Sequence, residues 1–138
     1  MTKNRVSELS ADDRAWLLRA EEHILKLARA KYSVGGFTHG EDDLMALQRL
    51  IDDRVITAAD VLGAQCVGVA LGNVFVAQLA MQWARVANEF GDMIALHDEV
   101  SGWTYYPLTM ISKRFEDGRG VDLVALYRDL ASTLRSNR

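Results

Sequence analysis

Residues 58–84 read AADVLGAQCVGVALGNVFVAQLAMQWA, and no charged side chain occurs from Val61 to Ala84. An uncharged run of this length is long enough to span a membrane. It nevertheless contains four amide side chains and three glycines, and few of the large aliphatic residues that drive membrane insertion. We therefore expect a buried central helix, covered on most sides by other helices and a sheet, and no membrane span.

Small residues recur every four positions along this run, at Ala64, Gly68 and Gly72. This spacing places them on one side of a helix, where they form a smooth stripe. The stripe predicts that a sheet or a crossing helix approaches the central helix closely. At the start of the run, Thr57 followed three positions later by Asp60 predicts the N-terminal cap of the helix.

Two helices are predicted before the central run. Ser10 precedes an acidic pair and an apolar pattern of helical period, which indicates a capped amphipathic helix that ends near Tyr32. The segment SVGGFTHG, residues 33–40, then interrupts the pattern with three glycines. A shorter helix is expected from about Asp42.

Three short aromatic and aliphatic segments follow the central run: QWARVANEF (82–90), MIALHD (93–98) and WTYYP (103–107). Their lengths and the turn residues between them predict an antiparallel meander. Pro107 then suits the first position of a helix that Gly118 ends, and Asp122 caps a last helix. The fold class expected is α+β: N-terminal helices and a long buried central helix on a three-stranded meander, followed by two C-terminal helices, in a single domain of residues 1–138.

Two stretches resemble a known family. LGNVFVAQLAMQWARVANEFG (71–91) and YYPLTMISKRFEDG (105–118) are similar to the bacterial domain-of-unknown-function family 3806. The resemblance covers about residues 61–127, and its most specific part is the eight-residue run Pro107–Arg114. It implies a small bacterial cytoplasmic domain and brings no established activity. Residues 1–60 are interpreted from periodicity alone as a helical N-terminal part.

Composition narrows the functional classes. The net charge of −3 disfavours a nucleic-acid-binding surface, which needs clustered positive charge. Cys66 is the only cysteine, which excludes an intramolecular disulfide, and its apolar surroundings predict a buried thiol. The first residues lack the apolar core of a secretory signal, so a cytoplasmic location is expected. The three histidines lie at no metal-ligand spacing, and we expect neither a metal nor a cofactor.

The segment from Trp103 to Gly118 has two interpretations. The simpler one is a joint between a strand and a helix, in which Lys113 and Arg114 oppose the helix dipole. The alternative is a charged cleft in which the basic helix meets the acidic turn after the first meander strand. We assign no catalytic residue, and we name six candidate binding residues: Glu89, Asp92, His97, Ser112, Lys113 and Arg114.

A small sheet has at least one free edge, which proteins commonly cover with a partner. The sequence therefore favours a non-enzymatic protein-interaction module that forms a homodimer or binds another bacterial protein. The alternative is a small ligand-binding domain or enzyme with its cleft between the meander and the Pro107 helix. A concave pocket with ionisable groups would favour the alternative, and a strand-edge or apolar patch would favour the module.

Overall fold

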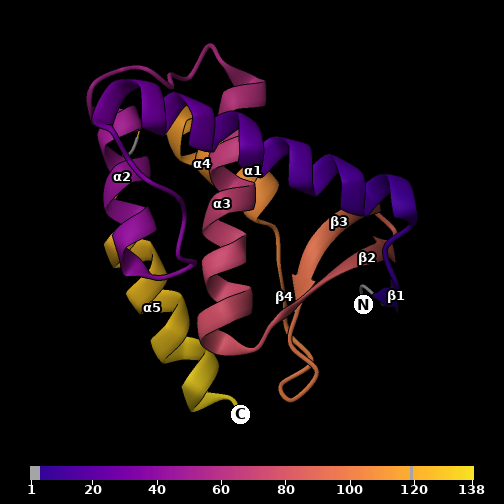
Figure 1. Ribbon diagram of the computed structural model, residues 1–138. Helices are drawn as coiled ribbons and strands as arrows, with labels where there is room; N and C mark the ends of the chain where they lie inside the picture. The colour runs from indigo at the N-terminus through magenta and orange to yellow at the C-terminus, as the bar shows by residue number, and fades with distance from the viewer. Residues whose placement is uncertain (1–3, 119) are drawn as a thin grey trace.

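The computed structural model describes residues 4–118 and 120–138, and its α+β architecture is shown in Figure 1. The helices are α1 (Ala11–Tyr32), α2 (Glu41–Asp52), α3 (Val61–Leu79), α4 (Pro107–Glu116) and α5 (Leu123–Ser136). The strands are β1 (Arg5–Ser7), β2 (Gln82–Asn88), β3 (Gly91–His97) and β4 (Thr104–Tyr105). The α+β class predicted from the sequence is confirmed.

The sheet has four strands in the order β1-β2-β3-β4, all antiparallel, so the predicted count of three strands is wrong. The predicted meander is present as β2, β3 and β4. The strand that was missed, β1, pairs with the far part of β2, with Val6 opposite Val86. Its three residues are all exposed and are too few to show an alternating pattern.

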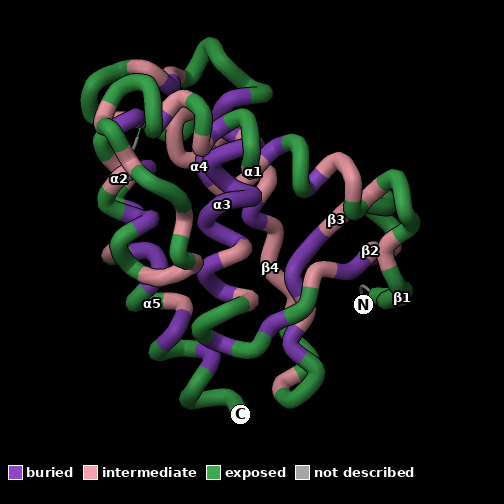
Figure 2. Tube along the Cα trace, in the orientation of Figure 1, coloured by how far each residue is buried: buried purple, intermediate pink, exposed green. Residues whose placement is uncertain are grey.

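Helix α3 is the centre of the fold, and Figure 2 shows that buried residues predominate along its middle part. Twelve of its 19 residues are buried, and α1, α2, α4 and α5 all pack against it. It is the one helix in the described parts of the chain that is long and apolar enough to cross a membrane, and most of it is covered by protein. Its N-cap is Asp60, whose side chain accepts from Gly63 N at 2.8 Å, so the cap predicted at Thr57 is wrong.

The stripe of small residues on α3 makes two close contacts. A Cβ on Gly68 would lie 2.1 Å from the backbone oxygen of Pro107, the first residue of α4. A Cβ on Gly72 would lie 2.3 Å from the indole of Trp83 in β2. The prediction that a sheet or crossing helix approaches this stripe is therefore confirmed by both neighbours.

Helix α1 reaches from α2 at one end to the sheet at the other (Figure 1). Ser10 is its N-cap, as predicted, and the structure adds a capping box in which the Asp13 side chain accepts from the Ser10 backbone. Asp13 also accepts two hydrogen bonds from Arg85 of β2, at 2.5 and 3.1 Å. Hydrogen bonds from Arg85 and from the Ser10 backbone lower the pKa of Asp13 to about 2. The start of α1 is thus fixed to one face of the sheet.

The end of α5 is tied to the middle of the chain through Asp98, which follows β3 and is 1% exposed. Asp98 accepts hydrogen bonds from Ser101 N and Oγ, at 3.0 and 2.6 Å, and from Arg138 Nη2 at 2.9 Å. Arg138 also donates to the carbonyl oxygen of Leu79, at the end of α3. We call Asp98, Ser101, Arg138 and the Leu79 carbonyl the Asp98 cluster.

Candidate functional site

A surface groove of about 510 Å³ lies between the β2–β3 turn and α4. Its wall on the sheet side includes Phe90 and Met93, and its wall on the helix side is made by Tyr106, Thr109 and Lys113. Asn4 and Asn88 complete the lining where β1 meets β2. We call this the Lys113 groove. It lies where the sequence placed the alternative cleft, between the meander and the Pro107 helix.

Large apolar side chains are exposed in the Lys113 groove and on the sheet beside it. Phe90 is 82% exposed, and Val6 and Met93 are 42% and 41% exposed. Cross-strand pairing aligns Val6 with Val86 and Val86 with Met93, so these residues share one face of the sheet. The turn that carries Phe90 is held by Asn88, whose Oδ1 accepts from Phe90 N at 2.8 Å.

The six candidate residues from the sequence do not form one cluster. Lys113 lines the groove together with residues of the β2–β3 turn, as the hypothesis required. Glu89 is an exposed residue of the same turn, whereas Ser112 and Arg114 are half-buried on α4 and are not part of the lining. Asp92 pairs with Arg85 at 3.2 Å. Because Asp92 precedes Met93 in the strand, it belongs to the opposite face of the sheet.

His97 lies at the other end of β3, opposite Gln82. Six residue steps separate it from Gly91, which at the rise of a strand is roughly 20 Å. Its Nδ1 atom is buried and has no hydrogen-bond partner among the described residues. His97 is therefore remote from the Lys113 groove and shares no site with it.

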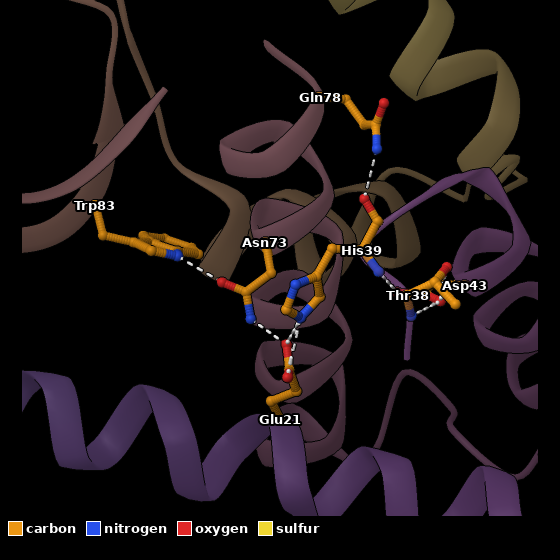
Figure 3. A network of polar contacts seen from close by, with 7 residues as sticks. All are labelled: Glu21, Thr38, His39, Asp43, Asn73, Gln78 and Trp83. Atoms are coloured by element: carbon orange, nitrogen blue, oxygen red, sulfur yellow. Dashed lines mark hydrogen bonds and ion pairs between the residues drawn. The ribbon is translucent and has the colours of Figure 1, made fainter. Parts of the chain in front are cut away.

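A second constellation, which the sequence did not reveal, is centred on Glu21 of α1 (Figure 3). The Glu21 carboxylate accepts from His39 Nε2, at 3.2 Å to each oxygen, and from Asn73 Nδ2. Asn73 Oδ1 in turn accepts from Trp83 Nε1 at 2.8 Å. The chain of contacts joins α1, the loop before α2, α3 and β2, and we call it the Glu21 network.

The loop that carries His39 is itself held firmly. His39 has a left-handed backbone conformation, with φ of 60°, which is uncommon for a residue other than glycine. Asp43, which is 4% exposed, accepts from Thr38 N at 2.9 Å and from His39 N at 2.8 Å. Gln78 donates to the His39 carbonyl at 3.0 Å. These bonds hold the imidazole over Glu21 despite the unfavourable backbone.

The Glu21 network borders a hollow of about 390 Å³. Its lining includes Glu21, Asn73 and Trp83 of the network, and Leu9, Leu17 and Leu18 provide apolar surface. Arg14 of α1 also lines it. We call this the Glu21 hollow. It combines a positioned carboxylate, a guanidinium and an apolar wall.

Two other chemistries find little support in residues 4–118 and 120–138. No group of three or more His, Cys, Asp or Glu side chains there could hold a metal ion. Cys66 is buried, as predicted, and burial raises the pKa of its thiol, which disfavours the reactive thiolate.

Comparison with known proteins agrees with this architecture, an α+β domain in which an antiparallel sheet and four helices enclose one apolar helix. The chain belongs to the family described as domain of unknown function (DUF3806), which matches residues 43–127. The predicted resemblance is confirmed, and the match begins inside α2 rather than at residue 61.

One solved structure shares the fold, a crystal structure from Bacteroides thetaiotaomicron VPI-5482 with a TM-score of 0.82 and 14% sequence identity. The match covers 92% of this chain and 47% of that one, so this chain spans about half the length of the solved protein. No curated protein sequence matches the chain.

Proposed function

We propose that this protein is a non-enzymatic interaction module that pairs with a second copy of itself through the Lys113 groove. The observation that carries the proposal is Phe90, a large apolar side chain that is 82% exposed on the rim of an apolar groove. A two-fold pair would bring the same surface of both copies together. Phe90 of each copy would then enter the groove of the other and lose its contact with water.

The charges around the groove support self-pairing. Lys113 is exposed and makes no ion pair with any residue in the described ranges. The turn beside Phe90 carries the acidic residue Glu89. In a two-fold pair, the turn of one copy brings this negative charge to Lys113 of the other. Opposite charges at such a rim fix the register of association, and like charges placed there oppose it by several kcal/mol.

The open edge of the sheet supports the same proposal. Strand β1 pairs with β2 on one side only, and it lies at the edge of the sheet next to the groove. Edge strands of this kind are commonly covered by another chain. We further propose a cytoplasmic location in a bacterium, which is supported by the covered state of α3 and by the family resemblance.

The test is sedimentation velocity at tens of micromolar protein. The wild type is expected to sediment at twice its monomer mass of 15.4 kDa. Phe90→Ser and Lys113→Glu should each shift it to the monomer, because the first removes the apolar anchor and the second opposes like charges. Val100→Ser serves as the matched control, since Val100 is 71% exposed and lies outside the groove.

A double variant that exchanges the charges of Glu89 and Lys113 tests whether these two residues meet in the dimer. If Glu89 of one copy meets Lys113 of the other, Glu89→Lys combined with Lys113→Glu should restore the dimer that Lys113→Glu loses. A monomeric wild type at these concentrations rejects self-pairing. The groove volume and its lysine would then favour the second candidate, a site for a small anionic ligand.

A further inference from the structure

We propose that the Glu21 hollow binds a free apolar α-amino acid in its zwitterionic form. In this assignment Glu21 receives the ammonium group, Arg14 receives the carboxylate, and the leucines of the hollow cover the side chain. The inference uses a different surface from the Lys113 groove and does not depend on self-pairing. Its elements are a positioned anion, an available cation and an apolar wall of suitable size.

The first element is the carboxylate of Glu21. Its two oxygens can accept about four hydrogen bonds, and His39 and Asn73 are the donors that occupy part of this capacity. The side chain is still 20% exposed, so a ligand can reach it. Asn73 is itself fixed by Trp83. A carboxylate held in this way is ready to receive a cation without reorganising.

The second element is Arg14. It is exposed, and its guanidinium makes no ion pair with the residues that the structure describes. It precedes Glu21 by two helical turns on α1, which places the two Cα atoms about 10 Å apart along the axis. That separation leaves room between the two charged groups for the ammonium and carboxylate of one α-amino acid. Both side chains line the same hollow.

The third element is the apolar wall. Leu18 is 66% exposed, although its neighbour Leu17 is 7% exposed and belongs to the core. Leu9 and Trp83 add apolar surface to the lining. A volume of about 390 Å³ suits a small molecule. The wall therefore favours an aliphatic or aromatic side chain over a charged one.

The backbone of the loop is consistent with a binding role. The left-handed conformation of His39 costs free energy, and residues in such conformations cluster at ligand sites. In this loop the strained backbone positions the His39 imidazole as a hydrogen-bond donor to Glu21. It does not serve to pack a side chain into the apolar core. His39 is thus a positioning residue for the carboxylate.

The experiment is isothermal titration calorimetry of the full chain with L-leucine, N-acetyl-L-leucine and L-leucinamide. L-Leucine is expected to bind, because it carries both charges. The acetylated compound lacks the ammonium and the amide lacks the carboxylate, so each should bind at least about tenfold more weakly. Binding of leucinamide as tight as that of leucine would contradict the role of Arg14.

Variants test the residues directly. Glu21→Gln and Arg14→Gln should each weaken L-leucine binding by about tenfold or more. Glu22→Gln and Arg19→Gln are the matched controls, since these exposed residues of α1 do not line the hollow. They should leave the affinity unchanged. Circular dichroism and thermal melts of all four variants separate lost binding from lost folding.

Leu18→Asp tests the hollow independently of whether Glu21→Gln folds, because Leu18 is exposed and its replacement leaves the core intact. It should abolish leucine binding. The proposal is overturned if L-leucine, L-methionine and L-phenylalanine all fail to bind at about 10 mM, a concentration that would reveal even millimolar dissociation constants. It is also overturned if the folded variants bind as tightly as the wild type.

Discussion

Replacing Gly68 with alanine is expected to destabilise the protein by about 2–3 kcal/mol, the cost of overpacking a tightly filled core. The new Cβ would lie 2.1 Å from the carbonyl oxygen of Pro107 and 3.1 Å from Leu108 Cα. Both are backbone atoms, so no side chain can rotate to make room. Alanine gains up to about 1 kcal/mol in helix propensity over glycine, which only partly offsets the clash.

Urea unfolding followed by tryptophan fluorescence measures this effect, and a melt should show a decrease in Tm of about 10 °C. Gly35→Ala is the matched control, because nothing lies within 4 Å of the Cβ that it would add. Its free energy of unfolding should stay within about 0.5 kcal/mol of the wild type. A Gly68→Ala variant as stable as the wild type would show that α4 does not cross α3 at this contact.

Replacing Arg138 with alanine is expected to cost about 2 kcal/mol, because it removes the charged partner of a nearly buried carboxylate. Asp98 would keep its two bonds from Ser101 and lose the guanidinium. The carbonyl of Leu79 would lose its donor as well. The estimate is below that of a fully buried pair because the Arg138 side chain is 25% exposed.

The pH dependence of the free energy of unfolding shows whether the loss in Arg138→Ala comes from Asp98. Burial acts to raise the pKa of Asp98, but hydrogen bonds from Arg138 and Ser101 outweigh it and lower the pKa to about 2. A lowered pKa stabilises the native state above the unfolded-state pKa of 3.8, and this stabilisation is lost as the pH falls through about 2. The free energies of unfolding of the wild type and Arg138→Ala should therefore show their largest difference at neutral pH. This difference should shrink as the pH falls toward 2.

Urea titrations at about pH 7 and about pH 3 would measure this convergence. Arg135→Ala is the control, since Arg135 is an exposed arginine of the same helix and makes no ion pair with a described residue. It should behave as the wild type at both values. A difference between Arg138→Ala and the wild type that does not depend on pH would assign the loss to packing rather than to Asp98.

Local signals explain why the helices could be predicted from the sequence. The side chains of Ser10 and Asp122 each accept a hydrogen bond from the backbone N–H three residues later, so each cap is encoded within four residues of sequence. Pro107 starts α4 through its own fixed backbone angle. The predicted position of the α3 cap was wrong because Thr57 and Asp60 are both acceptable cap residues. Only the tertiary structure selects Asp60.

Long-range pairing explains what the sequence could not show. Strand β1 takes its register from β2, about 80 residues later, and has no pattern of its own. The partners of Glu21 lie 18 and 52 residues away, in a loop and in a helix, so no spacing rule joins them. The meeting of Lys113 with the β2–β3 turn was foreseeable, because the meander returns the chain to α4. The pairing of Asp92 with Arg85 was not, because it depends on strand register.

The enclosure of α3 has a consequence for how the chain is made. When α3 leaves the ribosome, α4, which covers its stripe of small residues, has not yet emerged, because it begins about 30 residues later. At about 5–20 residues per second, this apolar segment waits for seconds without its cover. We expect chaperones that recognise nascent apolar segments to bind residues 61–79, and translation pauses that delay the emergence of α4 to lower the yield of native protein.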